Sequence, residues 1–357
     1  MTLERTCEIV PIEAVDPPEP GPGPVVSHES ALWLWRQGWT PVRHLDAEEA
    51  VAALGAAMRT DAVRRLRRWT RHPAECPIHV LCASQDVRRR IKRAVCHVVP
   101  AACRDPVPLV EARPPHGGPA VMAVAPEVSW AQLALKAGTP VARELAWELT
   151  GTFRPCDDAP FGLVGRDPLT TVADLMDAAV LLRGGCFPKH VGRMLQGVCD
   201  RTASPMEGRV ACLMTLPRRR GGHGIPTPEV NRPMGLTPEE ARIVGAGTVV
   251  PDFYWEDAGL VVEYDSDVAH GDARAADHDA RKRTLYAARG IVCLSLTRGQ
   301  LMDPAACDAF MDVVRGHLGM DPEEPRPGVW RNRVRLRRSL FGWNAAGLAA
   351  EGVGDVG

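Results

Sequence analysis

Three acidic side chains lie close together in the sequence on segments that favour extended structure. Residues 249–255 and 260–265 are rich in β-branched and aromatic residues, and the four residues between them suit a turn, so the sequence predicts a β-hairpin. Asp252 lies on the first arm, and Glu263 and Asp265 lie on the second. Because alternate side chains of a strand share one face, Glu263 and Asp265 point the same way. The hairpin therefore gathers three carboxylates on a small patch of sheet.

The register of the predicted hairpin decides what this patch can do. Pairing of Trp255 with Leu260 sets Asp252 directly opposite Glu263, and cross-strand partners have Cβ atoms roughly 4.5–5.5 Å apart. Two carboxylates about 4 Å apart repel each other by about 4 kcal/mol at a dielectric typical of the protein surface. A divalent cation removes this cost, and oxygen ligands favour magnesium, manganese or calcium over zinc. We therefore expect a hard-metal site at this hairpin.

Helices and further strands must position the hairpin. Residues 273–289 are rich in Ala, Arg and Lys and end at Gly290, which suits a helix C-terminus. Residues 291–297 form an apolar run of strand length. A helix that begins at Ser204 and a strand around Val230 are expected before the hairpin. The two arms of the hairpin are then followed by a helix (273–289), a strand (291–297) and a closing helix (300–318).

This order and these residues resemble the PD-(D/E)XK nuclease superfamily, and within it the branch similar to very-short-patch-repair endonucleases. The likeness covers about residues 200–318 of the chain. The matching pieces are Pro251-Asp252-Phe253, Glu263-x-Asp265, His270, Asp279-x-x-Lys282 and Gly290-Ile291-Val292. The resemblance implies an α/β (α+β) chain whose residues 201–320 form a restriction-endonuclease-like domain, with a mixed sheet flanked by helices.

The resemblance also implies a Mg²⁺- or Mn²⁺-dependent endonuclease, a hydrolase of DNA phosphodiester bonds. Asp252 and Glu263 would hold the metal together with the Tyr264 carbonyl, and the metal would polarise the phosphodiester and lower the pKa of a bound water. Lys282 on the following helix would stabilise charge that develops on the phosphate. His270 would act as general base or as acid for the leaving group, because its intrinsic pKa lies near neutral pH.

Three more acidic residues complete the comparison with the family. Glu207 matches the acidic residue that many such nucleases carry on their first helix. Asp265 departs from the pattern, which places a Lys two residues after the Glu. This departure puts activity in question, although some branches take the cation from the helix instead. Asp279 is expected to orient the helix or an Arg rather than to contact metal.

Each of these residues also has a purely structural interpretation. Glu207 follows Ser204 by three residues, which is the pattern of a helix capping box. Asp252 suits the protection of an edge strand beside a proline. Lys282 lies in a run of three basic residues, and such a run usually forms the solvated face of a helix. His270 is equally consistent with a loop cap.

The overall charge limits how the chain contacts DNA. The formal net charge is -1. This charge counts against a basic surface over the whole protein and requires any DNA contact to be local. Four local groups of basic residues are candidates for binding DNA phosphates. They are residues 64–71, 88–93, 218–220 and 331–338.

Composition and processing signals indicate a cytoplasmic protein that contacts no membrane. The eleven Cys are odd in number, dispersed and without a C-x-x-C pair, as expected of reduced thiols. Residues 1–15 carry Glu4, Arg5, Glu8 and Glu13 and lack the apolar centre of a signal peptide. No apolar run approaches the roughly eighteen residues of a membrane span.

The length of 357 residues exceeds what one core normally supports, so we expect more than one domain. Ser27-His28-Glu29-Ser30-Ala31-Leu32 and Val124-Ala125-Pro126-Glu127 resemble segments of AbiEi-type antitoxin proteins, which implies a cognate toxin or defence partner. The winged helix of those proteins is not evident ahead of Ser27. The expected organisation is a flexible Pro-rich lead-in (1–25), an AbiEi-like N-terminal α/β domain (26–150), a helical connector (151–200), the nuclease-like domain (201–320) and a basic tail (321–357).

Two functions remain open from the sequence. The first is a metal-dependent endonuclease in a defence or toxin–antitoxin context. The second is a catalytically inactive DNA-binding regulator or antitoxin-like protein that keeps the nuclease fold. The paired Asp252 and Glu263 favour the enzyme, because an inactive site would gain stability by losing one carboxylate. The sequence does not indicate an oligomeric state.

Overall fold

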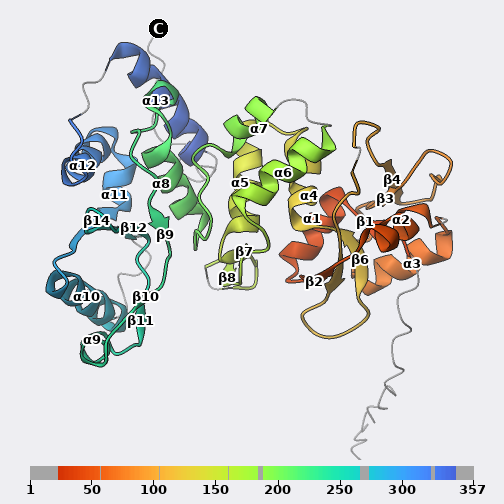
Figure 1. The fold of residues 1–357 in the computed structure, drawn as a ribbon, viewed down its shortest axis with the longest axis horizontal. Helices are drawn as coiled ribbons and strands as arrows, with labels where there is room; N and C mark the ends of the chain where they lie inside the picture. Colours follow the sequence, from red (N-terminus) through yellow and green to blue (C-terminus); the bar gives the residue numbers. More distant parts are fainter. Residues whose placement is uncertain are drawn as a thin grey trace, which may run out of the picture.

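The computed structural model describes residues 23–56, 58–103, 105–159, 161–183, 188–265, 273–322 and 326–342. The molecule is elongated, with an N-terminal α/β unit at one end and a C-terminal α/β unit at the other (Figure 1). Both units combine sheets with flanking helices, which confirms the predicted mixed α/β class. No described helix is both long enough and apolar enough to cross a membrane.

A six-stranded mixed sheet forms the centre of the N-terminal unit, in the order β2-β5-β6-β1-β3-β4. Its strands are β1 (Val25–Val26), β2 (Thr40–His44), β3 (Ile78–Cys82), β4 (Ala94–Val98), β5 (Leu109–Arg113) and β6 (Val121–Val124). Its helices are α1 (His28–Arg36), α2 (Ala47–Gly55), α3 (Thr60–Trp69) and α4 (Pro126–Ala134). The central β1 is fully buried and runs antiparallel to β3 and parallel to β6, so the sheet is mixed.

The two units are joined by a continuous hydrophobic core. The joining segment contains α5 (Thr139–Thr150), the hairpin β7 (Phe153–Pro155) and β8 (Leu163–Gly165), α6 (Val172–Leu182) and α7 (Pro188–Leu195). The expected helical connector therefore also carries a β-hairpin. Trp147 on α5 packs onto Gly208, where an added Cβ would lie 2.7 Å from the indole ring. Glycine permits this close approach, so the core passes from one unit into the next.

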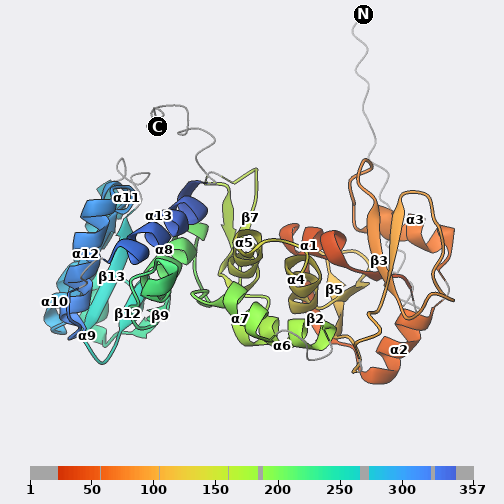
Figure 2. The same cartoon turned by 90° about the horizontal axis from the view of Figure 1, so that it is seen from above.

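A four-stranded sheet in the order β14-β13-β12-β9 forms the C-terminal unit. Its elements are α8 (Pro205–Thr215), β9 (Glu229–Val230), β12 (Phe253–Trp255), β13 (Leu260–Asp265), α10 (Ala273–Ala288) and β14 (Val292–Thr297). β13 runs parallel to β14, whereas β12 runs antiparallel to both β13 and β9. Helix α10 lies on one side of the sheet and α8 on the other (Figure 2). All predicted elements occur in the predicted order, but three elements that were not predicted lie between β9 and β12.

Prolines divide two elements that the sequence predicts as continuous. The first arm of the hairpin separates into β11 (Thr248–Val249) and β12, because Pro251 between them has no N–H for a sheet ladder. β11 pairs instead with β10 (Met234–Gly235), and α9 (Pro238–Val244) lies between these two strands. The predicted helix over 300–318 forms α11 (Arg298–Met302) and α12 (Pro304–His317), with Asp303 capping the second helix ahead of Pro304.

The segment expected as a basic tail contains a packed helix, α13 (Pro327–Phe341). Two of its arginines, Arg333 and Arg337, are buried. The Arg333 guanidinium donates to the carbonyls of Gly221 and Gly222 at 3.3 and 3.2 Å. Arg337 donates to the carbonyl of Leu301. Two of the five arginines between 331 and 338 therefore fix the helix, whereas the other three are exposed.

Candidate active site

The β12–β13 hairpin brings Asp252 and Glu263 together. Trp255 pairs with Leu260, as predicted, and the same register continues through Phe253 opposite Val262. The backbone N–H of Asp252 donates to Oε2 of Glu263 at 3.3 Å. These contacts place both acidic side chains at the end of β12, on the same side of the sheet as α10.

The backbone of β13 also orients Asp252. The N–H of Tyr264 donates to Oδ2 of Asp252 at 2.7 Å. Because the N–H and C=O of one strand residue point to the same neighbouring strand, the Tyr264 carbonyl is directed towards the side on which Asp252 lies. The donor set expected for a metal, two carboxylates and this carbonyl, therefore faces one space.

Helix α10 supplies two partners to the carboxylate of Glu263. The Lys282 ammonium lies 2.8 Å from Oε1, and the Tyr286 hydroxyl donates to the same oxygen at 3.1 Å. Lys282 also donates to the carbonyl of Val250 at 3.4 Å. Residues four apart on a helix share one face, which explains why Lys282 and Tyr286 reach the same oxygen.

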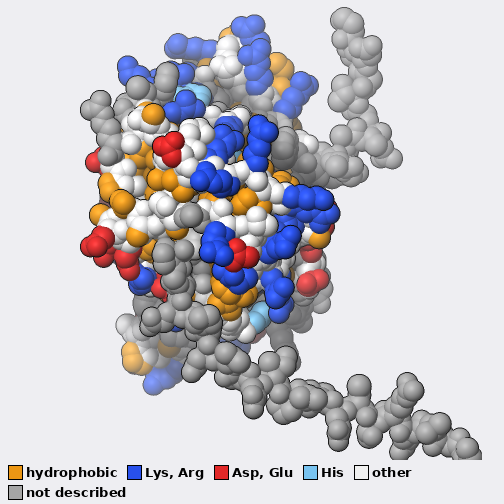
Figure 3. All heavy atoms as spheres, turned by 90° about the vertical axis from the view of Figure 1, so that its right-hand side faces the viewer, with side chains coloured by type: hydrophobic (Ala, Val, Ile, Leu, Met, Phe, Trp, Pro, Cys, Tyr) orange, Lys and Arg blue, Asp and Glu red, His pale blue; other side chains and the backbone are white. Residues whose placement is uncertain are grey.

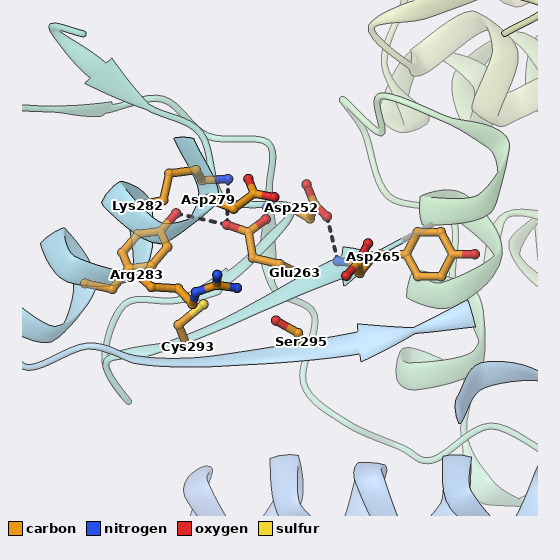
Figure 4. A pocket seen from close by; sticks show the side chains of 10 residues that line it. Asp252, Glu263, Asp265, Asp279, Lys282, Arg283, Cys293 and Ser295 are labelled. Carbon is orange, nitrogen blue, oxygen red and sulfur yellow. Dashed lines mark hydrogen bonds and ion pairs between the residues drawn. The ribbon is translucent and has the colours of Figure 1, made fainter. Parts of the chain in front are cut away.

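These groups surround a cavity of about 240 Å³ between α10 and the sheet. Figure 4 shows Asp252, Glu263 and Asp279 directed to the space beside Lys282, with Asp265 farther along β13. The cavity is lined by Asp252, Glu263, Tyr264, Asp265, Asp279, Lys282, Arg283, Tyr286, Cys293 and Ser295. It is therefore a polar site that offers both carboxylates and cations.

Burial and mutual repulsion disturb the titration of the acidic groups. Burial, followed by repulsion from Glu263 and Glu207, raises the pKa of Asp252 well above its usual value. Burial and the charge of Glu263 also raise the pKa of Tyr286, and the Cys293 thiol has a pKa of about 11 for the same reasons. The cavity thus concentrates more negative charge than Lys282 alone relieves, which is the condition under which a further cation is bound favourably.

Glu207 lies behind the cavity rather than in its wall. Its carboxylate accepts from the backbone N–H of Ala203 at 2.8 Å and from the Asn231 amide at 2.6 Å, and contacts the Ser204 hydroxyl at 3.0 Å. The Ser204 hydroxyl in turn accepts from the backbone N–H of Glu207, so the predicted capping contact is present on one side. The N–H of Asn231 donates to the carbonyl of Asp252 at 3.1 Å. Glu207 therefore supports the strand that carries Asp252.

The remaining predicted residues either line the cavity or lie outside the described part of the chain. Asp265 and Asp279 line the cavity, as does Lys282. His270 lies outside the described residues. Arg283 also lines the cavity, and its guanidinium has no hydrogen bond or ion pair within the described part of the chain (Figure 4).

Sequence reasoning assigned no site role to Arg283 and did not single out Tyr286, Cys293 or Ser295. Tyr286 follows Lys282 by one helical turn, and this spacing was the available signal. Cys293 and Ser295 alternate on β14, parallel to β13, and Ser295 is the register partner of Glu263. A predicted parallel β13–β14 pair would have identified both.

The donor set fits a hard divalent cation with few protein ligands. Among the residues that the structure describes, no three or more His, Cys, Asp or Glu side chains are arranged to hold a metal. Two carboxylates and a carbonyl nevertheless suit Mg²⁺, which usually binds one or two carboxylates and keeps several waters. Burial and the charges of Glu263 and Glu207 raise the pKa of Asp252, and the nearby Lys282 ammonium offsets only part of this effect.

Comparison with known proteins gives no match to a family model, a curated protein or a solved structure.

Proposed function

We propose that this protein is a metal-dependent endonuclease that hydrolyses DNA phosphodiester bonds. The observation that carries the proposal is the convergence of Asp252 and Glu263 from paired strands beside two cations of α10, Lys282 and Arg283. A structural role accounts poorly for two adjacent carboxylates in a half-buried cavity, because their repulsion lowers stability. A role in binding a cation and a phosphodiester accounts for all four residues.

The residues of the cavity would have separate roles in metal binding and in catalysis. Asp252, Glu263 and the Tyr264 carbonyl would hold Mg²⁺ or Mn²⁺, which supplies polarisation of the phosphodiester and a more acidic bound water. Arg283 would bind a non-bridging phosphate oxygen, since its guanidinium has no other partner within the described residues. Lys282 would stabilise negative charge that develops on the phosphate as the bond breaks.

DNA is the proposed substrate because the cavity is open and its cations lie on an exposed helix. A chain of net charge -1 needs such local cations to approach a polyanion. The sequence resemblance to nucleases and to antitoxin-type proteins adds a defence or toxin–antitoxin setting to the proposal. In that setting the protein would act on DNA in the cytoplasm.

A catalytically inactive DNA-binding regulator is the second candidate, and one observation favours it. The Lys282 ammonium already forms an ion pair with Glu263 at 2.8 Å, with both side chains less than one-fifth exposed. A permanent pair of this kind would leave Glu263 with less charge for a metal. The sequence also favours this candidate, because Asp265 stands where the nuclease pattern has Lys.

Cleavage assays separate the two candidates. Purified protein with Mg²⁺ or Mn²⁺ is incubated with plasmid, mismatched duplex and single-stranded DNA. We expect nicking or cutting of at least one substrate, and we expect Glu263→Gln to lower the rate by about a hundredfold or more. Glu256→Gln is the matched control, because Glu256 lies in the turn of the same hairpin with its side chain 65% exposed.

Cleavage that requires metal and Glu263 but not Glu256 supports the enzyme. Absence of cleavage of all three substrates with either metal, or equal cleavage by wild type and Glu263→Gln, rejects it. DNA binding without cleavage then supports the regulator.

A further inference from the structure

A second cavity, of about 480 Å³, lies in the N-terminal unit, remote in sequence from the candidate active site. The C-terminal ends of α1 and α3 and the loop between β5 and β6 form its walls. The side chains that matter for its chemistry are Trp33, Trp39, Arg68, Trp69, Arg71 and His116. The cavity therefore combines flat aromatic surfaces with cations.

The tryptophans give this cavity both apolar area and a free donor. Trp39 is only 4% exposed, yet its indole N–H has no hydrogen-bond partner among the described residues. An indole N–H without a partner among these residues is able to donate to an acceptor of a ligand in the cavity. Trp69 remains 37% exposed at the edge of α3, which is unusual for a side chain of its size. The exposure of Trp33 is intermediate, and its ring lies 5.5 Å from that of His72.

Both arginines that line the cavity carry a charge that no other described residue compensates. The side chains of Arg68 and Arg71 are exposed, and their guanidinium groups have no hydrogen bond or ion pair within the described ranges. Arg67, which directly precedes Arg68, has a different role, because its guanidinium donates at 2.7–3.2 Å to three backbone carbonyls of the loop after α3 and to the carbonyl of Arg93. Arg64, one helical turn before Arg68, extends the free charge along α3.

The positive charge of Arg68 and Arg71 is part of a larger basic surface on the N-terminal unit. Figure 3 shows Lys and Arg side chains gathered over the end formed by the N-terminal unit, with few Asp or Glu between them. The exposed residues of the loop between β3 and β4 include Arg88, Arg89, Arg90, Lys92 and Arg93. A polyanion approaching this end would meet favourable charge before it reached the cavity.

The backbone at Arg71 adds a second, independent feature. The N–H of Arg71 donates to the carbonyl of Arg68, and the N–H of His72 donates to that of Arg67, which together form a Schellman motif at the end of α3. Arg71 occupies the left-handed position of this motif, with φ 51°, where glycine is usually found. An arginine is therefore held at a strained position beside the cavity.

We propose that this cavity binds an unpaired nucleobase and its adjoining phosphate in a single-stranded nucleic acid. The base would stack on the tryptophan faces, as bases do on the aromatic platforms of single-strand-binding proteins. The Trp39 N–H would donate to an acceptor on the base edge, and Arg68 and Arg71 would bind phosphate oxygens. A base within a duplex is stacked and cannot enter, so the site selects single strands. An acidic protein would satisfy the arginines but not the aromatic walls.

Binding is measured without cleavage, so the proposal does not depend on the proposed nuclease activity. Full-length protein in EDTA is titrated against fluorescein-labelled single-stranded DNA, single-stranded RNA of the same sequence, the corresponding DNA duplex and polyglutamate. We expect both single strands to bind more tightly than the duplex and polyglutamate. The DNA and RNA arms show which sugar the site prefers.

Three variants test the site. Trp69→Ala should weaken single-strand affinity about tenfold, since it removes one stacking face. Arg71→Gly should weaken it to a similar extent while raising the thermal midpoint, because glycine relieves the left-handed backbone. Arg242→Ala, at a side chain that is 77% exposed on α9, removes the same charge far from the cavity and should change affinity less than about twofold.

Each outcome decides the proposal. Loss of affinity in Trp69→Ala and in a stable Arg71→Gly supports it. Unchanged affinity in Arg71→Gly, duplex binding equal to single-strand binding, or equally tight binding of polyglutamate overturns it, and the last result would indicate an acidic protein partner instead.

Discussion

The ammonium group of Lys282 lies 2.8 Å from Oε1 of Glu263, while among the described residues the other carboxylate oxygen of Glu263 accepts only from the backbone N–H of Asp252. The helix therefore binds one oxygen and leaves the other directed towards Asp252. Lys282 and a metal ion would compete for the charge of Glu263. The same lysine would nevertheless favour cleavage if it stabilises a phosphate in the transition state.

Replacing Lys282 separates these two effects. In Lys282→Met we expect tighter binding of Mn²⁺, because Glu263 is released from its ion pair, and slower cleavage, by about a hundredfold, because the cation at the phosphate is lost. Calorimetric titration with Mn²⁺ measures the first effect and a plasmid-nicking assay the second. Arg281→Ala is the control on the same helix, since Arg281 pairs with Asp277 at 2.8 Å and lies outside the cavity. Weaker Mn²⁺ binding in Lys282→Met would contradict competition.

The hydroxyl of Tyr286 positions Glu263 without contacting the proposed substrate. Tyr286→Phe removes the 3.1 Å hydrogen bond but keeps the fully buried ring. Hydrogen bonds to charged groups contribute about 1.5–3 kcal/mol, so we expect a loss of this order in the free energy of unfolding. The urea midpoint should fall with an unchanged m-value.

Tyr254, on strand β12, supplies the control for Tyr286→Phe. Tyr254 is 8% exposed, and its hydroxyl has no hydrogen-bond partner among the described residues. Tyr254→Phe should therefore leave the urea midpoint nearly unchanged. Equal destabilisation by the two substitutions would show that the bond to Glu263 contributes nothing, and would remove Tyr286 from the site.

The hairpin could be predicted because its information is local. A four-residue turn between two β-rich arms fixes the pairing of Trp255 with Leu260, and this register determines where Asp252 and Glu263 meet. The break at Pro251 was not predicted, because a proline is compatible with an edge strand as well as with a strand boundary. The juxtaposition of the two acids did not depend on it.

The contribution of α10 could be predicted only in part. Arg281, Lys282 and Arg283 are consecutive, and each successive side chain of a helix points about 100° from the last. The sequence alone does not fix the rotation of the helix on the sheet, so it does not decide which cations face the cavity. The structure places Lys282 and Arg283 there and leaves Arg281 outside.

The arginines of α13 show a different limit. Arg333 and Arg337 are four residues apart and buried, whereas Arg331, Arg335 and Arg338 are exposed. The buried pair is stable because carbonyls from distant segments, those of Gly221, Gly222 and Leu301, accept from the guanidinium groups. Such partners are tertiary and leave no signal in the local sequence. The alternating arginines of residues 331–338 therefore led to the prediction of a solvated tail.

Asp252 gives a prediction that is independent of catalysis. Since burial and neighbouring carboxylates raise its pKa in the folded state, the protonated form adds stability that is complete below the ordinary pKa of Asp, 3.8, and is lost as the pH rises through the raised value. Asn is neutral at every pH and still accepts from the Tyr264 N–H. Relative to wild type, Asp252→Asn should therefore gain stability between pH 4 and pH 8 in EDTA, with a difference of about 2–4 °C in thermal midpoint for each kcal/mol.

Metal should reverse this order, because a ligand that binds only the folded state raises its stability. At pH 8 with saturating Mg²⁺ or Mn²⁺, we expect the thermal midpoint of wild type to rise and that of Asp252→Asn to stay nearly constant. At about one hundred times the dissociation constant the gain is about 2.7 kcal/mol. Differential scanning fluorimetry at pH 4, 6 and 8, with and without metal, measures both effects. An equal metal response in the two proteins would mean that Asp252 is not a ligand, and a difference independent of pH in EDTA would mean that its carboxylate does not titrate as its surroundings require.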